Sequence, residues 1–130
     1  MDYNLVLGMK AEKNEKVTER NTAISYGSGG VAVYATPAMI GLMEGTSLAA
    51  VDPHLPEGMA TVGTSISVNH IAATPIGIEV RALAELTEID GKKLTFRIEA
   101  YDEKEKIGEG THQRYIIELE KFLARTQSKK

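Results

Sequence analysis

Several residue types that build specialised proteins are missing from this 130-residue sequence or are rare in it. It has no cysteine, which excludes disulfides, thiolate nucleophiles and cysteine-based zinc sites. No apolar run is long enough to span a bilayer as a helix. The first residues lack the basic segment that opens a signal peptide. The sequence therefore predicts no membrane partner and a cytoplasmic location.

An excess of charge of one sign is also missing. The 15 basic and 18 acidic residues leave a net charge of −3, which gives no support for a nucleic-acid partner. His54 and His112 do not have the spacing of metal ligands, so we expect no metal site. We expect His112 to lie on the polar side of its strand, either solvated or at an interface.

The residues that are present describe an ordinary globular protein, with 42% hydrophobic and 25% charged residues. This length predicts a single domain over residues 1–130. Residues 4–9 have the pattern of a short strand. Thr36 and Pro37 are typical of a helix start, with Thr36 as N-cap and Pro37 as the first helical residue. We expect the helix to end near Val51, before Asp52 and Pro53.

Beyond residue 58 the pattern changes to period-two alternation. Residues 60–72 alternate with the even positions mostly apolar, and further strands are expected over 78–86, 94–100 and 107–119. Asp90 and Gly91 mark a hairpin turn. Residues 120–130 suggest a short amphipathic helix. One largely apolar helix followed by four antiparallel strands predicts an α+β hot-dog fold, in which the sheet wraps around the helix.

Glu44 is the only charged residue between Thr36 and Val51. On a helix, it shares one stripe with Ile40 and Leu48. Burying an ionised carboxylate costs on the order of several kcal/mol unless a partner compensates. We therefore expect Glu44 either to take part in catalysis or to belong to a polar network whose hydrogen bonds are all satisfied.

His70 is the second unusual residue, because it takes an apolar position of its strand beside Ile66 and Val68. A strand that faces the helix would let His70 pair with Glu44, and such a pair can activate a water. The Thr36 hydroxyl could point at the same place, and the N–H groups at the helix start could stabilise an oxyanion there. Structural alternatives are a plain N-cap for Thr36, a core or interface histidine for His70, and an ion pair for Glu44 with Arg81, Arg97 or Arg114.

Three segments, residues 34–44, 63–75 and 107–122, resemble the fluoroacetyl-CoA thioesterase family of hot-dog proteins. In that family a threonine, a glutamate and a histidine form the catalytic set. The resemblance implies these roles for Thr36, Glu44 and His70. It also implies substrate contacts for Gly63 and Arg114.

The resemblance implies hydrolysis of a short-chain acyl-CoA thioester to a free acid and coenzyme A. Coenzyme A is then part of the substrate, and no separate cofactor is expected. A homodimer or higher oligomer is expected from the fold. The family's phenylalanine-rich lid has no equivalent in the glycine-rich residues 25–34, which favours a generic short acyl group over fluoroacetyl. The alternatives are a non-catalytic acyl-CoA-binding module and, more remotely, a hydratase.

Overall fold

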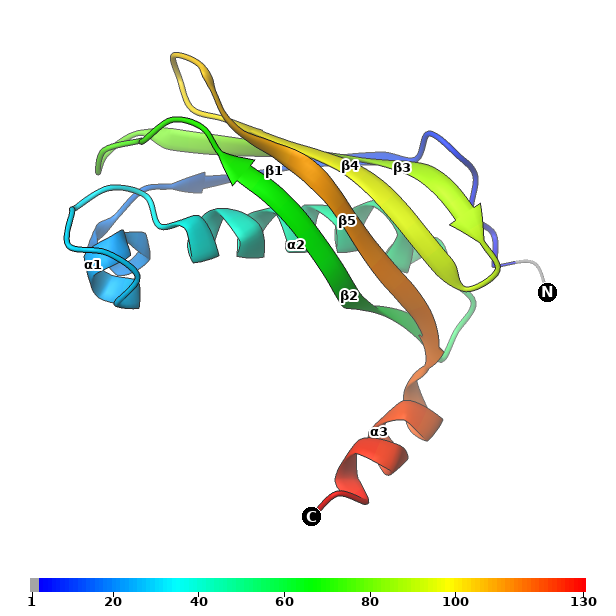
Figure 1. Cartoon of the computed structure of the whole chain (residues 1–130). Helices are drawn as coiled ribbons and strands as arrows, with labels where there is room; N and C mark the ends of the chain where they lie inside the picture. Colours follow the sequence, from blue (N-terminus) through cyan, green and yellow to red (C-terminus); the bar gives the residue numbers. More distant parts are fainter. Residues whose placement is uncertain (1–2) are drawn as a thin grey trace.

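A five-stranded antiparallel sheet curls around one long helix in the computed structural model, which describes residues 3–130 (Figure 1). The helix, α2, spans Thr36–Val51. The strands are β1 (Lys10–Lys16), β2 (Met59–His70), β3 (Glu79–Asp90), β4 (Lys93–Tyr101) and β5 (Lys106–Glu118), in the spatial order β1-β3-β4-β5-β2. The predicted α+β arrangement of one sheet around one helix is confirmed.

Shorter helical pieces join and extend these elements. They are η1 (Glu19–Asn21), α1 (Ala23–Tyr26), η2 (Asp52–His54) and α3 (Leu119–Gln127). In Figure 1, α3 follows β5 and projects away from the sheet. Within residues 3–130, no helix has both the length and the apolarity needed to cross a membrane.

The first strand lies later in the chain than the sequence predicted. Residues 4–9 are irregular, and β1 is the charged segment Lys10–Lys16, which pairs with β3 from Lys10–Glu85 to Lys16–Glu79. The apolar side chains of Leu5 and Met9 pack against the core without joining a strand. Charged residues are common on edge strands, where they discourage pairing with other chains. The apolar segment was therefore the wrong indicator of β1.

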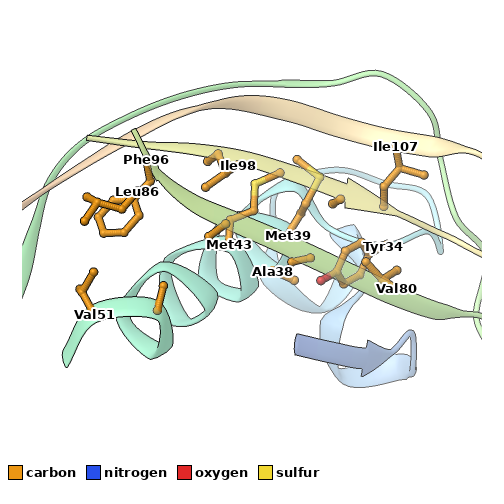
Figure 2. Packing of buried hydrophobic residues seen from close by; sticks show 14 of the residues in the cluster. Tyr34, Ala38, Met39, Met43, Val51, Val80, Leu86, Phe96, Ile98 and Ile107 are labelled. Carbon is orange, nitrogen blue, oxygen red and sulfur yellow. The ribbon is translucent and has the colours of Figure 1, made fainter. Parts of the chain in front are cut away.

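The core lies between α2 and the sheet (Figure 2). Met39 and Met43 point from the helix into the sheet and are fully buried. Gly108 of β5 makes room for them, since a Cβ at this position would lie 2.5 Å from the Met39 sulfur. The other buried residues of the helix and the sheet include Ala38, Ala50, Val51, Val80, Ala82, Ala84, Leu86, Leu94, Phe96, Ile98 and Ala100.

Strand β2 contains one extra residue relative to β5. Gly63 pairs with Arg114 and Ser65 pairs with Gln113, so Thr64 has no opposite residue. This is a β-bulge, a device that re-aims side chains next to it.

The bulge changes which side chains of β2 face the helix. Before it, the odd-numbered Thr61 is buried, whereas after it the even-numbered Ile66, Val68 and His70 are half-buried and alternate with exposed neighbours. The predicted even-numbered inner face is therefore confirmed for residues 66–70 and wrong for residues 60–63. The extra residue lets Thr61 and His70, which have opposite parity, face the same side of the sheet.

Candidate functional site

Thr36 and His70 meet at the N-terminal end of α2. Thr36 Oγ1 and His70 Nδ1 are 2.7 Å apart and share a hydrogen bond. Thr36 is the first residue of the helix, and the N-cap is Ala35, which provides no side-chain cap. The prediction that Thr36 is the N-cap and Pro37 the first helical residue is therefore wrong by one position. The hydroxyl bonds the imidazole instead of a backbone N–H.

The His70 ring is half-buried and has one nitrogen free. Burial lowers the pKa of His70 below its ordinary value of 6.5, while a backbone interaction with Ala72 opposes the shift. His70 Nε2 is buried and has no hydrogen-bond partner within residues 3–130. Buried polar atoms are seldom left unpaired, and this one calls for an explanation. In the tautomer that carries its hydrogen on Nδ1, a neutral imidazole can act as a general base through Nε2.

A cavity of about 400 Å³ opens beside this pair. Its lining combines the polar groups of Thr36 and His70 with the apolar side chains of Val33, Ile71 and Ala72. This volume lies in the range of small-molecule sites, which typically have a mostly apolar wall and a few convergent polar groups. The cavity can therefore hold a small apolar group beside the Thr36–His70 pair.

Tyr34 supports His70 from inside the protein. It is 1% exposed, and its hydroxyl donates a hydrogen bond of 2.6 Å to Glu15 Oε2 on β1. Its ring meets the His70 ring edge-on, with 6.5 Å between the ring centroids. Burial and the neighbouring Glu15 both raise the pKa of Tyr34. Tyr34 thus belongs to the core and is not free to act as a lid over the cavity.

Glu44 lies elsewhere, against the middle of β2. A Cβ on Gly63 would lie 3.1 Å from Glu44 Oε2, 3.2 Å from His112 Cε1 and 3.4 Å from Arg114 Nη1. Three side chains therefore converge on the space that a side chain at position 63 would occupy. The first and last distances, measured to one point, limit the separation of Glu44 Oε2 and Arg114 Nη1 to about 6.5 Å. No ion pair joins them within residues 3–130.

The predicted pairing of Glu44 with His70 is wrong within one chain, because no hydrogen bond joins them in the described residues. His70 contacts the first residue of α2, and eight helical residues carry Glu44 about 12 Å further along the axis. Nor is Glu44 enclosed by aliphatic neighbours as predicted. It is half-buried, as is Ile40, and Leu48 on the same stripe is 39% exposed. The stripe lies at the border of the sheet-covered side of the helix.

Arg114 is a buried cation that is held by Thr61 and, through it, by Asp52. Arg114 Nε donates to Thr61 Oγ1 at 2.7 Å, and Nη2 donates to the Thr61 carbonyl oxygen at 3.0 Å. The Thr61 hydroxyl and N–H in turn donate to the two Asp52 carboxylate oxygens at 2.5 Å and 3.1 Å. Burial lowers the pKa of Arg114, and the negative charges of Asp52 and Glu44 oppose this shift.

His112 completes this cluster, and the prediction that it lies on the polar side of its strand is wrong. It is 1% exposed. Its position two residues before Arg114 was the available signal, since residues i and i+2 of a strand share a face. Thr61 was also missed, because the bulge reverses the alternation before it. Asp52 was taken only as the end of the helix.

The five predicted residues thus form two groups. Thr36 and His70 line the 400 Å³ cavity, whereas Glu44, Gly63 and Arg114 do not. The predicted substrate contacts of Gly63 and Arg114 stay predictions. Within residues 3–130, no group of three or more His, Asp or Glu side chains is placed to hold a metal ion.

Comparison with known proteins places the chain among thioesterases. Residues 17–120 match the family model described as fluoroacetyl-CoA-specific thioesterase. A fluoroacetyl-CoA thioesterase of Streptantibioticus cattleyicolor is 45% identical over 97 residues, which is 75% of this chain and 70% of that protein. A solved structure of the fluoroacetyl-CoA thioesterase FlK superposes with a TM-score of 0.90 at 36% identity, covering 97% of this chain and 98% of that one.

More distant structures agree on the fold. A thioesterase-superfamily protein of Thermus thermophilus superposes with a TM-score of 0.88 at 28% identity, covering 95% of this chain and 91% of that one. A hot-dog-like protein of Thermanaerovibrio acidaminovorans gives 0.87 at 20% identity, with the same coverage, and supports the fold alone. The predicted hot-dog fold and the family resemblance are both confirmed. The chain belongs to the fluoroacetyl-CoA-specific thioesterase family.

Proposed function

We propose that this chain hydrolyses a short-chain acyl-CoA thioester to a free carboxylic acid and coenzyme A. The observation that supports it most directly is the Thr36–His70 hydrogen bond beside a 400 Å³ cavity, with His70 Nε2 unpartnered. Membership in a thioesterase family indicates that the reaction this pair would take part in is thioester hydrolysis. Coenzyme A enters as part of the substrate, and the proposal needs no separate cofactor.

In the proposed reaction, a water or the Glu44 carboxylate attacks the thioester carbonyl carbon. If water attacks, Glu44 or His70 accepts its proton, the carbon–sulfur bond breaks, and the coenzyme A thiolate leaves and takes up a proton. If Glu44 attacks, water then hydrolyses the resulting anhydride. The Thr36 hydroxyl fixes the orientation of the His70 ring in either route.

The start of α2 offers donors for the developing oxyanion. The first N–H groups of a helix have no partner within it and point out of its N-terminal end. In α2 these include the N–H groups of Thr36 and Ala38, while Pro37 has none. They lie at the same end of the helix as the Thr36–His70 pair. Donors that are already in place stabilise negative charge in the transition state. The Gly63 N–H is the other candidate.

A homodimer through β2 is part of the proposal. β2 is an edge strand of 12 residues whose outer side pairs with no strand in residues 3–130. A long unpaired edge favours pairing with another chain. Antiparallel pairing of two copies of β2 would place the His70 end of one strand beside the Gly63 half of the other. His70 of one chain would thereby approach Glu44 of its partner.

Mixing two inactive variants tests this arrangement. Glu44→Gln and His70→Ala chains, unfolded together and refolded, should recover about a quarter of the wild-type activity if each site takes one residue from each chain, since half the dimers are mixed and each has one intact site. Size-exclusion chromatography with light scattering measures the oligomer. Full-length monomers that are active would overturn the shared site.

We further propose that the acyl group is a generic short chain. Phe96 is fully buried in the core, Phe122 lies on α3, and Tyr34 is bonded to Glu15. Phe96 and Phe122 do not line the cavity, and Tyr34 lines it with its hydroxyl held by Glu15. Of the exposed, glycine-rich residues 27–30, Ser28 lies in the cavity wall. Acetyl-CoA and its slightly longer homologues should therefore be hydrolysed at rates comparable to that of fluoroacetyl-CoA.

Release of free thiol from a panel of acyl-CoAs, read with a thiol dye, tests the reaction. Glu44→Gln keeps the shape of the side chain and removes its charge, so hydrolysis should fall by at least about 100-fold. Glu88→Gln, at an exposed position of β3, is the matched control and should be fully active. Tight binding of acyl-CoA without thiol release would favour the non-catalytic binding module. The cytoplasmic location stays a prediction, which cell fractionation can test.

A further inference from the structure

His112 is a buried imidazole to which the proposed reaction gives no task. It lies in the middle of β5 and is 1% exposed. His112 Nδ1 is 2.8 Å from the Ser65 carbonyl oxygen, and Nε2 is 3.2 Å from Arg114 Nη1. Both ring nitrogens are therefore engaged, in contrast to those of His70.

These two partners fix the protonation of the ring. A carbonyl oxygen only accepts hydrogen bonds, so Nδ1 carries the proton that goes to Ser65. A guanidinium only donates, so Nε2 must be the unprotonated acceptor for Arg114. His112 is thus a neutral imidazole in the Nδ1–H form. Burial and the charge of Arg114 both lower the pKa of His112, which agrees with this form.

The bulge in β2 lies next to the hydrogen bond between His112 and Ser65. Thr64 is the extra residue, and the Ser65 carbonyl that follows it accepts from the imidazole of the neighbouring strand. The Phe96 ring covers the imidazole, with 6.2 Å between the ring centroids. The ring therefore has one orientation, set by a backbone carbonyl on one side and by packing on the other.

The orientation of the ring determines where Arg114 points. Thr61 holds Nε and Nη2 of the guanidinium, and His112 holds Nη1. Arg114 Nη1 is also the atom of Arg114 nearest to the Gly63 Cβ position, at 3.4 Å, and Glu44 Oε2 lies 3.1 Å from the same point. Without the imidazole acceptor, one buried N–H of the cation would lose its partner, and the guanidinium could turn away from Glu44.

We propose that His112 is a positioning residue of the thioesterase site, which acts by accepting a hydrogen bond from Arg114 and so aims the guanidinium at the Glu44 carboxylate. This role rests on the proposed function. It requires an acceptor at the place of Nε2 and does not require a histidine that changes its protonation.

Two substitutions separate this role from simple packing. His112→Gln places an amide oxygen near the position of Nε2 and should keep kcat within about fivefold of wild type, because the acceptor for Arg114 is retained. His112→Leu fills similar space without an acceptor and should lower kcat by about 10- to 100-fold, with KM changed less than threefold, since misplaced catalytic groups slow the chemical step. Ile116→Val, also buried on β5, is the control for general loosening of the strand and should keep kcat.

A measurement on the resting protein is independent of activity. Nitrogen NMR of the three imidazoles at neutral pH, assigned by comparison with His112→Gln, should show the His112 ring in the Nδ1–H form with Nε2 unprotonated. A protonated or Nε2–H ring at His112 would overturn the inferred hydrogen bonds. Equal loss of kcat in the Gln and Leu variants, or no loss in either, would overturn the positioning role. Failure of the wild type to hydrolyse any acyl-CoA, with the expected NMR form, would instead refute the proposed function.

Discussion

Gly63→Ala gives the sharpest test of the Glu44 cluster, because it adds one carbon at the point where three side chains converge. The new Cβ would lie 3.1 Å from Glu44 Oε2 and 3.2 Å from His112 Cε1, whereas ordinary contacts are 3.4–4 Å. The carboxylate must therefore move by a few tenths of an ångström. Displacements of about 1 Å cost on the order of 100-fold in rate, so we expect kcat to fall about 10-fold.

The stability of this variant should hardly change. Gly63 does not have a positive φ, so alanine fits the backbone there. Replacing glycine at such a position restricts the unfolded chain and stabilises by about 0.4–1 kcal/mol, which the crowding offsets. We expect the free energy of unfolding to stay within about 1 kcal/mol of wild type. Urea unfolding and thiol-release kinetics on the same preparation measure both quantities.

Gly41→Ala is the matched control. Gly41 is an exposed residue of α2 with no neighbouring atom within 4 Å of a built Cβ. Alanine there should stabilise the helix by about 1 kcal/mol and leave kcat unchanged. Wild-type kcat in Gly63→Ala would refute the view that the placement of Glu44 against β2 matters to the reaction, and a large loss of stability would refute the steric reasoning.

Other perturbations address the Thr36–His70 pair. Thr36→Val removes the hydroxyl that bonds His70 Nδ1 and should lower kcat about 10-fold or more, whereas Thr36→Ser should stay within a few-fold of wild type, as measured by thiol release. Because burial lowers the pKa of His70, kcat/KM should remain level as the pH falls to 6.5 and decline only below it; a decline that begins above pH 6.5 would contradict this. Burial lowers the pKa of both His70 and His112. Below pH 6.5 the unfolded chain therefore binds more protons than the folded protein, and thermal melting should show stability falling as the pH drops through that range. Tyr34→Phe removes the hydrogen bond to Glu15 and should cost about 1–2 kcal/mol in urea unfolding while leaving kcat within threefold, since the ring edge toward His70 is kept.

Local patterns in the sequence were enough for the helix and the strands that follow it. The helix was predicted to within one residue at its start and correctly at its end, Val51, because its start and stop signals lie next to it in the chain. β1 was placed six residues too early, because its identity depends on pairing with β3, nearly seventy residues away. An edge strand made mostly of charged residues has no local apolar signal, so only the tertiary pairing reveals it.

The site was predictable by residue type but not by arrangement. Glu44 and His70 were singled out because a carboxylate and an imidazole occupied apolar positions; His70 lines the cavity, whereas Glu44 lies beside Gly63, and their catalytic roles stay predictions. The prediction that they pair directly was wrong, because the sequence alone does not show which part of the helix a given strand residue faces. His112 was missed because one extra residue in β2 and the glycines of β5 obscure which face is inward. Such offsets arise from pairing between strands and leave no mark on either strand by itself.

The unpaired Thr64 has a consequence for the evolution and engineering of this fold. Side chains alternate with a period of two, so a strand trimmed by that single residue would rotate everything on one side of the cut by half a turn. Either the imidazole at position 70 or the Thr61 anchor of the guanidinium would then be turned to the outer surface. The number of residues from Gly63 to His70 is accordingly as constrained as their identities, and a chimera that exchanges β2 between relatives must preserve that count.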